Sequence, residues 1–144
     1  MLRRTFLCLC SAVAASSAVR PAFGQPLPRL DLEQIRAEGD LGFGAATRAL
    51  AGQRVVATGY LIPHSKAGAG YQVLASSPLV TCPHCFPDLP MPPDALVMYL
   101  REDAALPTGA MIEVEGVLDL GAKRDPWTGL VSLARLFDGS LYLS

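Results

Sequence analysis

The sequence predicts a mainly β protein, organised as one small five-stranded barrel behind a short helical leader. Five segments rich in β-branched and aromatic residues follow one another at short intervals after Gly52. Two of these segments contain an internal glycine, Gly59 and Gly116, where the strands of a tightly coiled barrel must bend. The connections between the segments have turn signals and little helical pattern.

The first 24 residues have the composition of an export signal. Arg3 and Arg4 precede an apolar run that is too short, and too interrupted by serine, to span a bilayer comfortably. The arginine pair followed by residues 5–7 resembles a twin-arginine signal, whose pathway carries folded cargo, and an ordinary secretory signal is the alternative. We therefore expect cleavage after residue 24, a periplasmic or secreted protein, and no stable transmembrane segment in the remainder.

Removal of this signal changes the charge and the cysteine content of the chain. It removes three arginines and no acid, which leaves nine basic residues against 13 acidic ones, a net charge near −4. Such a charge argues against nucleic acid, or an anionic membrane surface, as the main partner. Cys8 and Cys10 leave with the signal, so Cys82 and Cys85 remain, in a compartment where disulfides persist. The remaining 120 residues suffice for one domain with a modest core.

Residues 25–50 are predicted to form a leader with short helices. The stretch 31–40 offers Asp31 as a helix N-cap, apolar residues at a helical interval, and Gly39 as a stop. The stretch 43–52 has a second helical pattern, which ends at a glycine.

The barrel domain is predicted to occupy residues 51–144. The first two strands form a hairpin across the glycine-rich loop 64–70, and the fourth begins with an alternation of apolar and acidic residues that indicates one solvated face. An OB-like barrel is the leading architecture and a small β-sandwich is the alternative; neither fold identifies a function. The strands are predicted over residues 53–63, 71–77, 95–101, 111–120 and 129–137, with an extension at 141–143.

The segment Cys82-Pro83-His84-Cys85 is the most distinctive chemical feature of the chain. A reactive CxxC pair normally has its first cysteine at a helix N-terminus, which lowers the thiol pKa. Here four prolines follow within eight residues of Cys85, and they oppose a continuing helix. This context disfavours a thioredoxin-type enzyme, although thiol exchange on another scaffold remains an alternative.

The same segment could hold a metal or a disulfide. A closed zinc site needs four ligands, and the mature chain offers Cys82 and Cys85 with His84 and His64. Copper(I) would be satisfied by the two thiolates alone. A Cys82–Cys85 disulfide, which would fix the proline-rich loop against the barrel, is the structural alternative.

No pattern in the chain indicates catalysis. We find no nucleophile motif, no phosphate-binding glycine loop and no paired acids in a cleft, so no catalytic or cofactor-binding residue is predicted. Trp127, within residues 125–130, is predicted to be a core or rim aromatic beside a turn. Glu113 and Glu115 are predicted to lie on the solvated face of their strand.

Several short patterns together resemble an uncharacterised family of small exported bacterial OB-like domains. They are LAGQRVVATGYLIP, CPHCFPDLP, GAMIEVEGVLDLG and DPWTGLVSLARL, and the resemblance covers about residues 50–137. The shared features are a Gly-Tyr-apolar-apolar-Pro strand, a Cys/His/Pro motif and a late Asp-Pro turn. The resemblance implies a periplasmic domain that accompanies membrane transport systems, including metal-linked ones, with Cys82, His84 and Cys85 as the matched positions. The Asn-Gln pair that follows the prolines in many relatives is missing here.

The sequence therefore predicts a periplasmic binding or accessory module that uses the Cys82–Cys85 loop, binding zinc or copper or a protein partner such as a membrane transport system. Nucleic acid is not an expected partner. Two alternatives remain: a thiol-disulfide oxidoreductase, and a structural interaction domain with a permanent Cys82–Cys85 disulfide.

Overall fold

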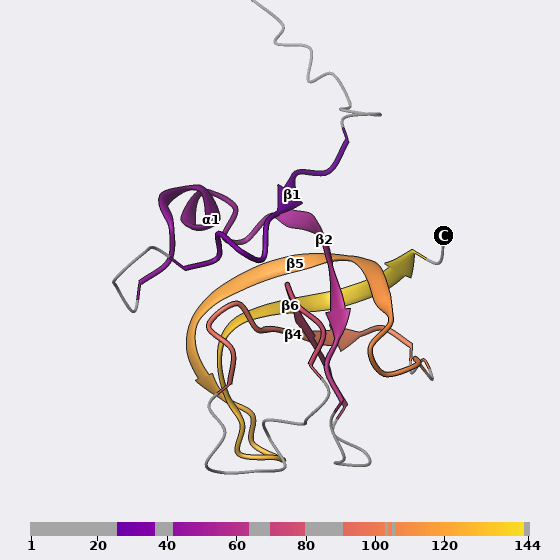
Figure 1. Ribbon diagram of the computed structural model, residues 1–144. Coiled ribbons are helices and arrows are strands. Elements are labelled where there is room, and N and C mark those ends of the chain that lie inside the picture. Colours follow the sequence, from indigo (N-terminus) through magenta and orange to yellow (C-terminus); the bar gives the residue numbers. More distant parts are fainter. Residues whose placement is uncertain are drawn as a thin grey trace, which may run out of the picture.

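The computed structural model describes residues 26–36, 42–63, 70–79, 91–102, 104 and 106–142. Within these ranges the chain is mainly β, with one short helix (Figure 1). The elements are β1 (Arg29–Leu30), α1 (Ala45–Ala49), β2 (Arg54–Leu61), β3 (Gln72–Ala75), β4 (Leu96–Leu100), β5 (Met111–Arg124) and β6 (Val131–Tyr142).

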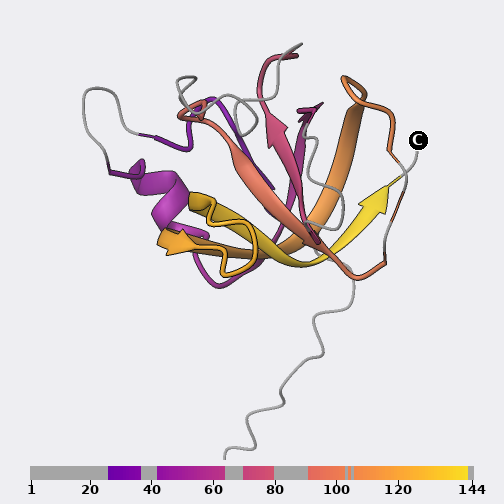
Figure 2. The ribbon, with the colours of Figure 1, turned by 90° about the horizontal axis from the view of Figure 1, so that it is seen from below.

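Five of the strands close into a barrel. β2 pairs with β3 and β3 with β4, both antiparallel, and β4 then pairs in parallel with β6. β6 pairs antiparallel with β5, which returns to β2 and completes the ring. Figure 2, seen from below, shows these strands curving around a common interior. The insertion of the last strand between β4 and β5 gives the Greek-key connection of an OB-fold, so the predicted OB-like barrel is confirmed.

The alternation predicted for the fourth barrel strand is present in β5. Ile112, Val114 and Leu118 are buried and face the interior, whereas Glu113 and Glu115 on the other face are half-buried. β5 is longer than predicted because irregular pairing with β6 extends it through a β-bulge region to Arg124. The strands therefore form where the period of two places apolar side chains inside.

The core fills the barrel interior and continues beneath the N-terminal segment. Its members are apolar side chains contributed by all five barrel strands, together with three residues that precede them in the chain. They are Leu30, Leu32, Ile35, Val55, Ala57, Leu61, Leu74, Leu96, Met98, Ile112, Val114, Leu118, Ala134 and Leu136.

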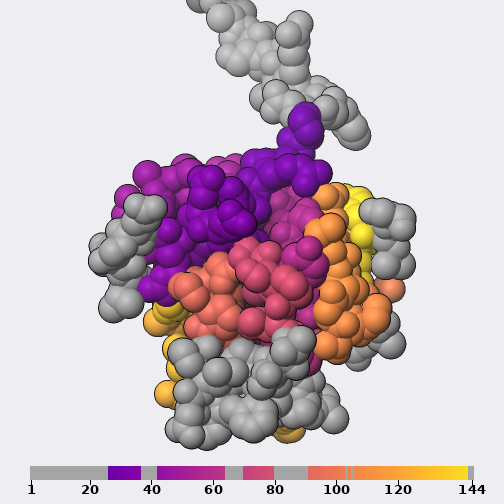
Figure 3. All heavy atoms as spheres, viewed as in Figure 1, coloured from indigo at the N-terminus to yellow at the C-terminus, as the bar shows by residue number. Residues whose placement is uncertain are grey.

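The N-terminal segment covers one end of the barrel. β1 pairs in parallel with β2, and in Figure 3 the indigo and purple atoms of this segment spread over the upper part of the barrel. Leu32 inserts its side chain against Gly59, where a Cβ atom would lie 2.5 Å from Leu32 Cδ1 and 2.8 Å from the Ala75 carbonyl oxygen. Gly59 therefore makes room for Leu32, and this is the physical reason for a glycine inside β2.

The predicted helix at residues 31–40 is wrong over its described part, because residues 31–36 form turns. The Asp31 carboxylate accepts a hydrogen bond from the Glu33 N–H at 3.0 Å, and the Asp31 carbonyl accepts one from Gln34 at 3.2 Å. The apolar spacing in this stretch directs Leu32 and Ile35 into the barrel end without a helix.

The helix predicted at residues 43–52 is confirmed, but it is shorter, because α1 spans Ala45–Ala49. The buried Thr47 hydroxyl donates to the Gln34 carbonyl oxygen at 3.1 Å, which ties α1 to the turn that precedes it. Gly52, where the chain leaves the helix, adopts a φ of 77° that favours glycine.

Candidate functional site

The residues predicted to form the site lie outside the described ranges. These are Cys82, His84 and Cys85 in the connection between β3 and β4, and His64 in the connection between β2 and β3. The distances between them are therefore not part of the structure. The described residues on either side show where the cysteine-containing connection leaves and rejoins the barrel.

The β3–β4 connection has an ordered base. The Ser76 N–H donates to Asp94 Oδ2 at 2.7 Å, which joins the residue after β3 to a residue just before β4. Further along, Leu79 and Met91 both pack on one apolar cluster on the outside of the barrel. The chain on both sides of the Cys82–Cys85 segment is thus fixed to the same surface.

That apolar cluster covers the outer face of β3 and β4. These two strands carry apolar residues on both faces, so one set enters the core and the other faces outward and is buried by connections. In OB-folds this face, with the loops beside it, is a common ligand-binding surface. The buried members here are Ile62, Tyr71, Val73, Ala75, Val97 and Leu130, with Leu79, Met91, Ala95 and Tyr99 packed against them.

A hydrogen-bond network fixes the β5–β6 turn beside this cluster. Asp125 accepts hydrogen bonds from the Tyr99 hydroxyl at 3.0 Å, the Trp127 N–H at 3.1 Å, and both the N–H and the hydroxyl of Thr128 at 2.8 and 2.9 Å. Tyr71 donates to the Thr128 hydroxyl at 3.2 Å. The turn is therefore bonded to residues beside β3 and within β4 as well as to its own backbone.

The network changes the acidity of its members. Burial alone would raise the pKa of Asp125, but the hydrogen bonds from Thr128, Tyr99 and the Trp127 backbone outweigh it and hold that pKa below its usual value. Burial, with the hydrogen bond to Asp125 and its charge, raises the pKa of Tyr99 to about 12. Asp125 is thus a stable carboxylate acceptor and Tyr99 a stable neutral donor.

A partly buried ion pair lies next to this network on the outer face of β5 and β6. Arg135 is only 1% exposed, and its guanidinium donates to Asp119 Oδ2 at 2.6 and 2.9 Å and to the Ser132 carbonyl oxygen at 2.8 Å. The Tyr99 ring stacks on the Phe137 ring with 5.0 Å between centroids. Arg135 is thus satisfied by Asp119 and Ser132, while the Tyr99 hydroxyl bonds to Asp125 in the neighbouring network.

Trp127 is exposed, so its prediction as a core or rim aromatic is wrong. The side chain is 85% exposed on the β5–β6 turn. The order Asp-Pro-Trp-Thr-Gly indicated the turn. The exposure of the indole could not be predicted from that pattern, because it depends on how the turn is anchored to Tyr71 and Tyr99.

Glu113 and Glu115 lie on the outer face of β5, as predicted, but they are less exposed than a fully solvated face implies. Both lie half-buried on the outer face of β5, where Glu113 pairs with Arg29 at 3.0 Å and Glu115 with Arg54 at 3.5 Å. They therefore contribute to a network of surface ion pairs.

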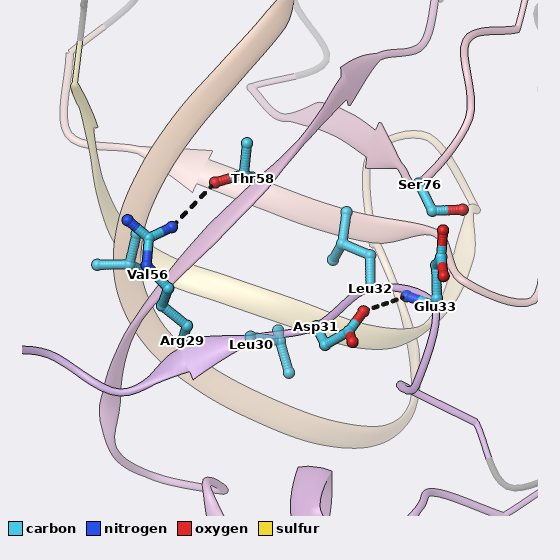
Figure 4. Close-up of a pocket in the computed structure, with 8 residues that line it drawn as sticks. All are labelled: Arg29, Leu30, Asp31, Leu32, Glu33, Val56, Thr58 and Ser76. Atoms are coloured by element: carbon cyan, nitrogen blue, oxygen red, sulfur yellow. Dashed lines mark hydrogen bonds between the residues drawn. The ribbon is translucent and has the colours of Figure 1, made fainter.

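A shallow groove of about 410 Å³ runs between the N-terminal segment and β2 (Figure 4). At one end, Arg29 Nη1 donates to Glu113 at 3.0 Å and contacts the Thr58 hydroxyl at 3.5 Å. At the other end, the Asp31 carboxylate accepts the Glu33 N–H. Most of these polar groups bond to each other. The groove is therefore best described as the contact between the N-terminal segment and the barrel.

Within the described residues no three His, Cys, Asp or Glu side chains lie close enough to hold a metal ion. α1, the helix found in that part of the chain, is too short to cross a membrane. The Cys and His candidates lie outside the described residues, so the metal interpretation stays a prediction.

Comparison with known proteins found one distant structural similarity. No family model matches the chain, and no curated protein matches it. The crystal structure of a DUF3299 family protein from Pseudomonas aeruginosa is similar, with a TM-score of 0.39 and 17% sequence identity. The match covers 67% of this chain and 65% of that one.

Proposed function

We propose that the protein is a periplasmic binding or accessory module in which the β3–β4 connection, with Cys82 and Cys85, contacts a partner or holds a metal ion. The supporting observation is the ordered base of that connection, where Ser76 bonds to Asp94. A segment held at both ends is partly preorganised for binding, because less conformational entropy is lost when it forms a contact.

The barrel scaffold around the cysteine segment is our reason for proposing binding and not redox catalysis. After the cysteine segment, residues 91–95 form a turn and lead directly into β4, with no helix among them. The barrel therefore differs from the thioredoxin scaffold, in which a long helix follows the CxxC pair and lowers the thiol pKa. Accordingly, we assign Cys82 and Cys85 as contact or metal-binding residues, with His84 and His64 as further donors that fit zinc or copper.

The test begins with thiol counting and metal analysis of protein purified from the periplasm. Zinc and copper(I) are then titrated into the reduced protein and into a Cys82→Ser/Cys85→Ser variant. We expect the unaltered protein to bind zinc or copper(I) much more tightly than the double serine variant does. His64→Ala, which leaves both cysteines in place, tests whether His64 is one of the ligands.

The base of the connection provides a second comparison. Asp94→Ala removes the acceptor of the Ser76 N–H and leaves both cysteines in place. If the base preorganises the loop, this variant should bind the metal more weakly than the unaltered protein. Equal binding by the unaltered protein and the double serine variant would exclude a metal site. Turnover of a dithiol substrate would establish the oxidoreductase instead, and a disulfide that resists mild reduction would establish the structural domain.

A further inference from the structure

The β5–β6 turn is a rigid platform. Besides the four hydrogen bonds accepted by the Asp125 carboxylate, the backbone pairs Asp125 N–H with the Leu130 carbonyl at 2.8 Å and Gly129 N–H with the Asp125 carbonyl at 2.9 Å. Gly129 has a φ of 75°, which favours glycine at this position. In Figure 1 this turn lies below the barrel, on the side away from α1.

This platform carries an exposed apolar group. The Trp127 indole is 85% exposed, and Val131, which starts β6, is 45% exposed. Keeping an indole in water costs free energy that burial would recover, and a rigid turn loses little entropy when the indole is buried. An exposed tryptophan on a fixed turn is therefore suited to insertion into an apolar or interfacial environment.

Two cations flank the indole in the sequence. Arg124 folds across the turn, with Nη1 donating to the Gly129 carbonyl oxygen at 2.9 Å, and within the described structure no carboxylate pairs with it. Lys123 is largely exposed and pairs with Asp119 at 3.0 Å, but that carboxylate is also bound by the buried Arg135. The carboxylates of Asp119 and Asp125 offset part of this charge, so Lys123, Arg124 and Arg135 leave a net charge of +1 at this end of the hairpin.

We propose that the β5–β6 turn, residues 123–131, is a membrane-interface contact that docks on an anionic bilayer, with Trp127 in the headgroup region and Arg124 and Lys123 beside lipid phosphates. Tryptophan prefers this interface because its ring is apolar and its N–H remains hydrated. The net charge near −4 of the chain after residue 24 does not prevent the contact, because charges more than about 8 Å away are screened at physiological salt.

The proposed contact is weak and reversible, since it has one indole and two cations. Each cation near an anionic surface should contribute about a fivefold gain in partitioning at moderate salt. It is independent of Cys82 and Cys85, so failure of the proposed metal or partner site would leave it unaffected.

The test uses the chain without its first 24 residues and two kinds of vesicle, phosphatidylcholine alone and phosphatidylcholine mixed with phosphatidylglycerol. Trp127 is the single tryptophan, so its fluorescence reports on this turn without labelling. We expect a blue shift of its emission and cosedimentation with the anionic vesicles, both of which weaken as salt is added.

Matched variants locate the contact. Trp127→Ala should lower cosedimentation about tenfold and Arg124→Gln about fivefold. Met111→Ala removes a 64% exposed apolar side chain at the opposite end of β5, and Arg48→Gln removes an exposed arginine on α1; both should bind like the unaltered protein. Circular dichroism would verify that each variant is folded.

Three outcomes would overturn the proposal: no emission shift at millimolar anionic lipid, equal binding to both kinds of vesicle, or equal losses in the control variants. A shift of Trp127 emission only on addition of a protein partner would assign the turn to a protein interface instead.

Discussion

At the scale of single residues, Arg135 is the most deeply buried charged side chain in the described structure. Its charge is balanced by Asp119, which is itself partly exposed and shared with Lys123. Removing one partner of such a pair leaves an uncompensated buried charge, which is costly, whereas replacing both by apolar groups can be nearly neutral.

We therefore predict that Asp119→Ala lowers the free energy of unfolding by about 2–3 kcal/mol. Lys123→Ala removes only the exposed partner of the same carboxylate and should cost less than about 1 kcal/mol. Urea denaturation would measure both. The paired change Asp119→Leu/Arg135→Met should be much less destabilising than the sum of Asp119→Leu and Arg135→Met measured singly. A loss equal to that sum would contradict this account.

Tyr99 predicts an alkaline response. Its pKa is raised to about 12, chiefly by burial, whereas an unfolded tyrosine ionises near about 10. The neutral side chain therefore contributes stability that is complete below about pH 10 and is lost as pH rises toward about 12. In Tyr99→Phe the free energy of unfolding should fall less steeply over this interval. Urea denaturation at several alkaline pH values tests this, and identical slopes would refute it.

At the scale of elements, the strands were more predictable than the leader. The alternation in β5 and the β-branched run in β2 follow directly from the period of two. The helix predicted over residues 31–40 was wrong for residues 31–36. An Asp31 that caps a backbone N–H and apolar residues three apart are compatible with a turn as well as with a helix. The choice depends on Leu32 entering the barrel at Gly59, which is a long-range contact that local patterns do not contain.

The Leu32–Gly59 contact is itself testable. Gly59→Ala should destabilise the fold by about 2 kcal/mol because the new methyl group overlaps Leu32 Cδ1 and the Ala75 carbonyl oxygen. Leu32→Ala should cost about 3 kcal/mol by emptying the same space. The double variant should lose less stability than the sum of the two single losses, because the new methyl group no longer meets the Leu32 side chain. Full additivity in thermal or urea unfolding would show that the residues are not coupled.

At the scale of the whole molecule, the barrel was predicted and its polar surface was not. Five strand patterns with two internal glycines favoured a barrel over a β-sandwich, and the pairing of β2 with β5 closes the ring. The network of Tyr71, Tyr99, Asp125 and Thr128 joins residues from three separate parts of the chain, so no single window of sequence contains it. The prediction of Cys82, His84, Cys85 and His64 as site residues rests on residue chemistry and stays open to the experiments above.

Acid sensitivity also belongs to the whole molecule, because paired aspartates are spread around the barrel. Hydrogen bonds from Arg101 and Arg54 hold the pKa of Asp138 well below its usual range, and hydrogen bonds from Arg135 and Lys123 outweigh burial at Asp119. Their stabilising contribution is present above the unfolded pKa of about 3.9 and is lost as pH falls below it.

Asp138→Asn isolates one of these contributions. Asp138 has a φ of 55°, a conformation that asparagine tolerates, so the substitution removes the charge while keeping the backbone. The variant should show a smaller drop in melting temperature between pH 5 and pH 3 than the unaltered protein. An unchanged drop would mean that the pairs with Arg54 and Arg101 do not contribute to acid stability.

The pairing of β2 with β5 sets the order in which the fold can form. Its register joins Arg54 to Val117 and Tyr60 to Met111, so the first barrel strand cannot find its final neighbour until most of the chain has left the ribosome. Contacts of such long range slow folding, and a nascent chain that lacks β5 exposes both β2 and the apolar side of β3. If the first 24 residues are a twin-arginine signal, as proposed, the folded chain's export from the cytoplasm would have to wait until this late ring closure is complete.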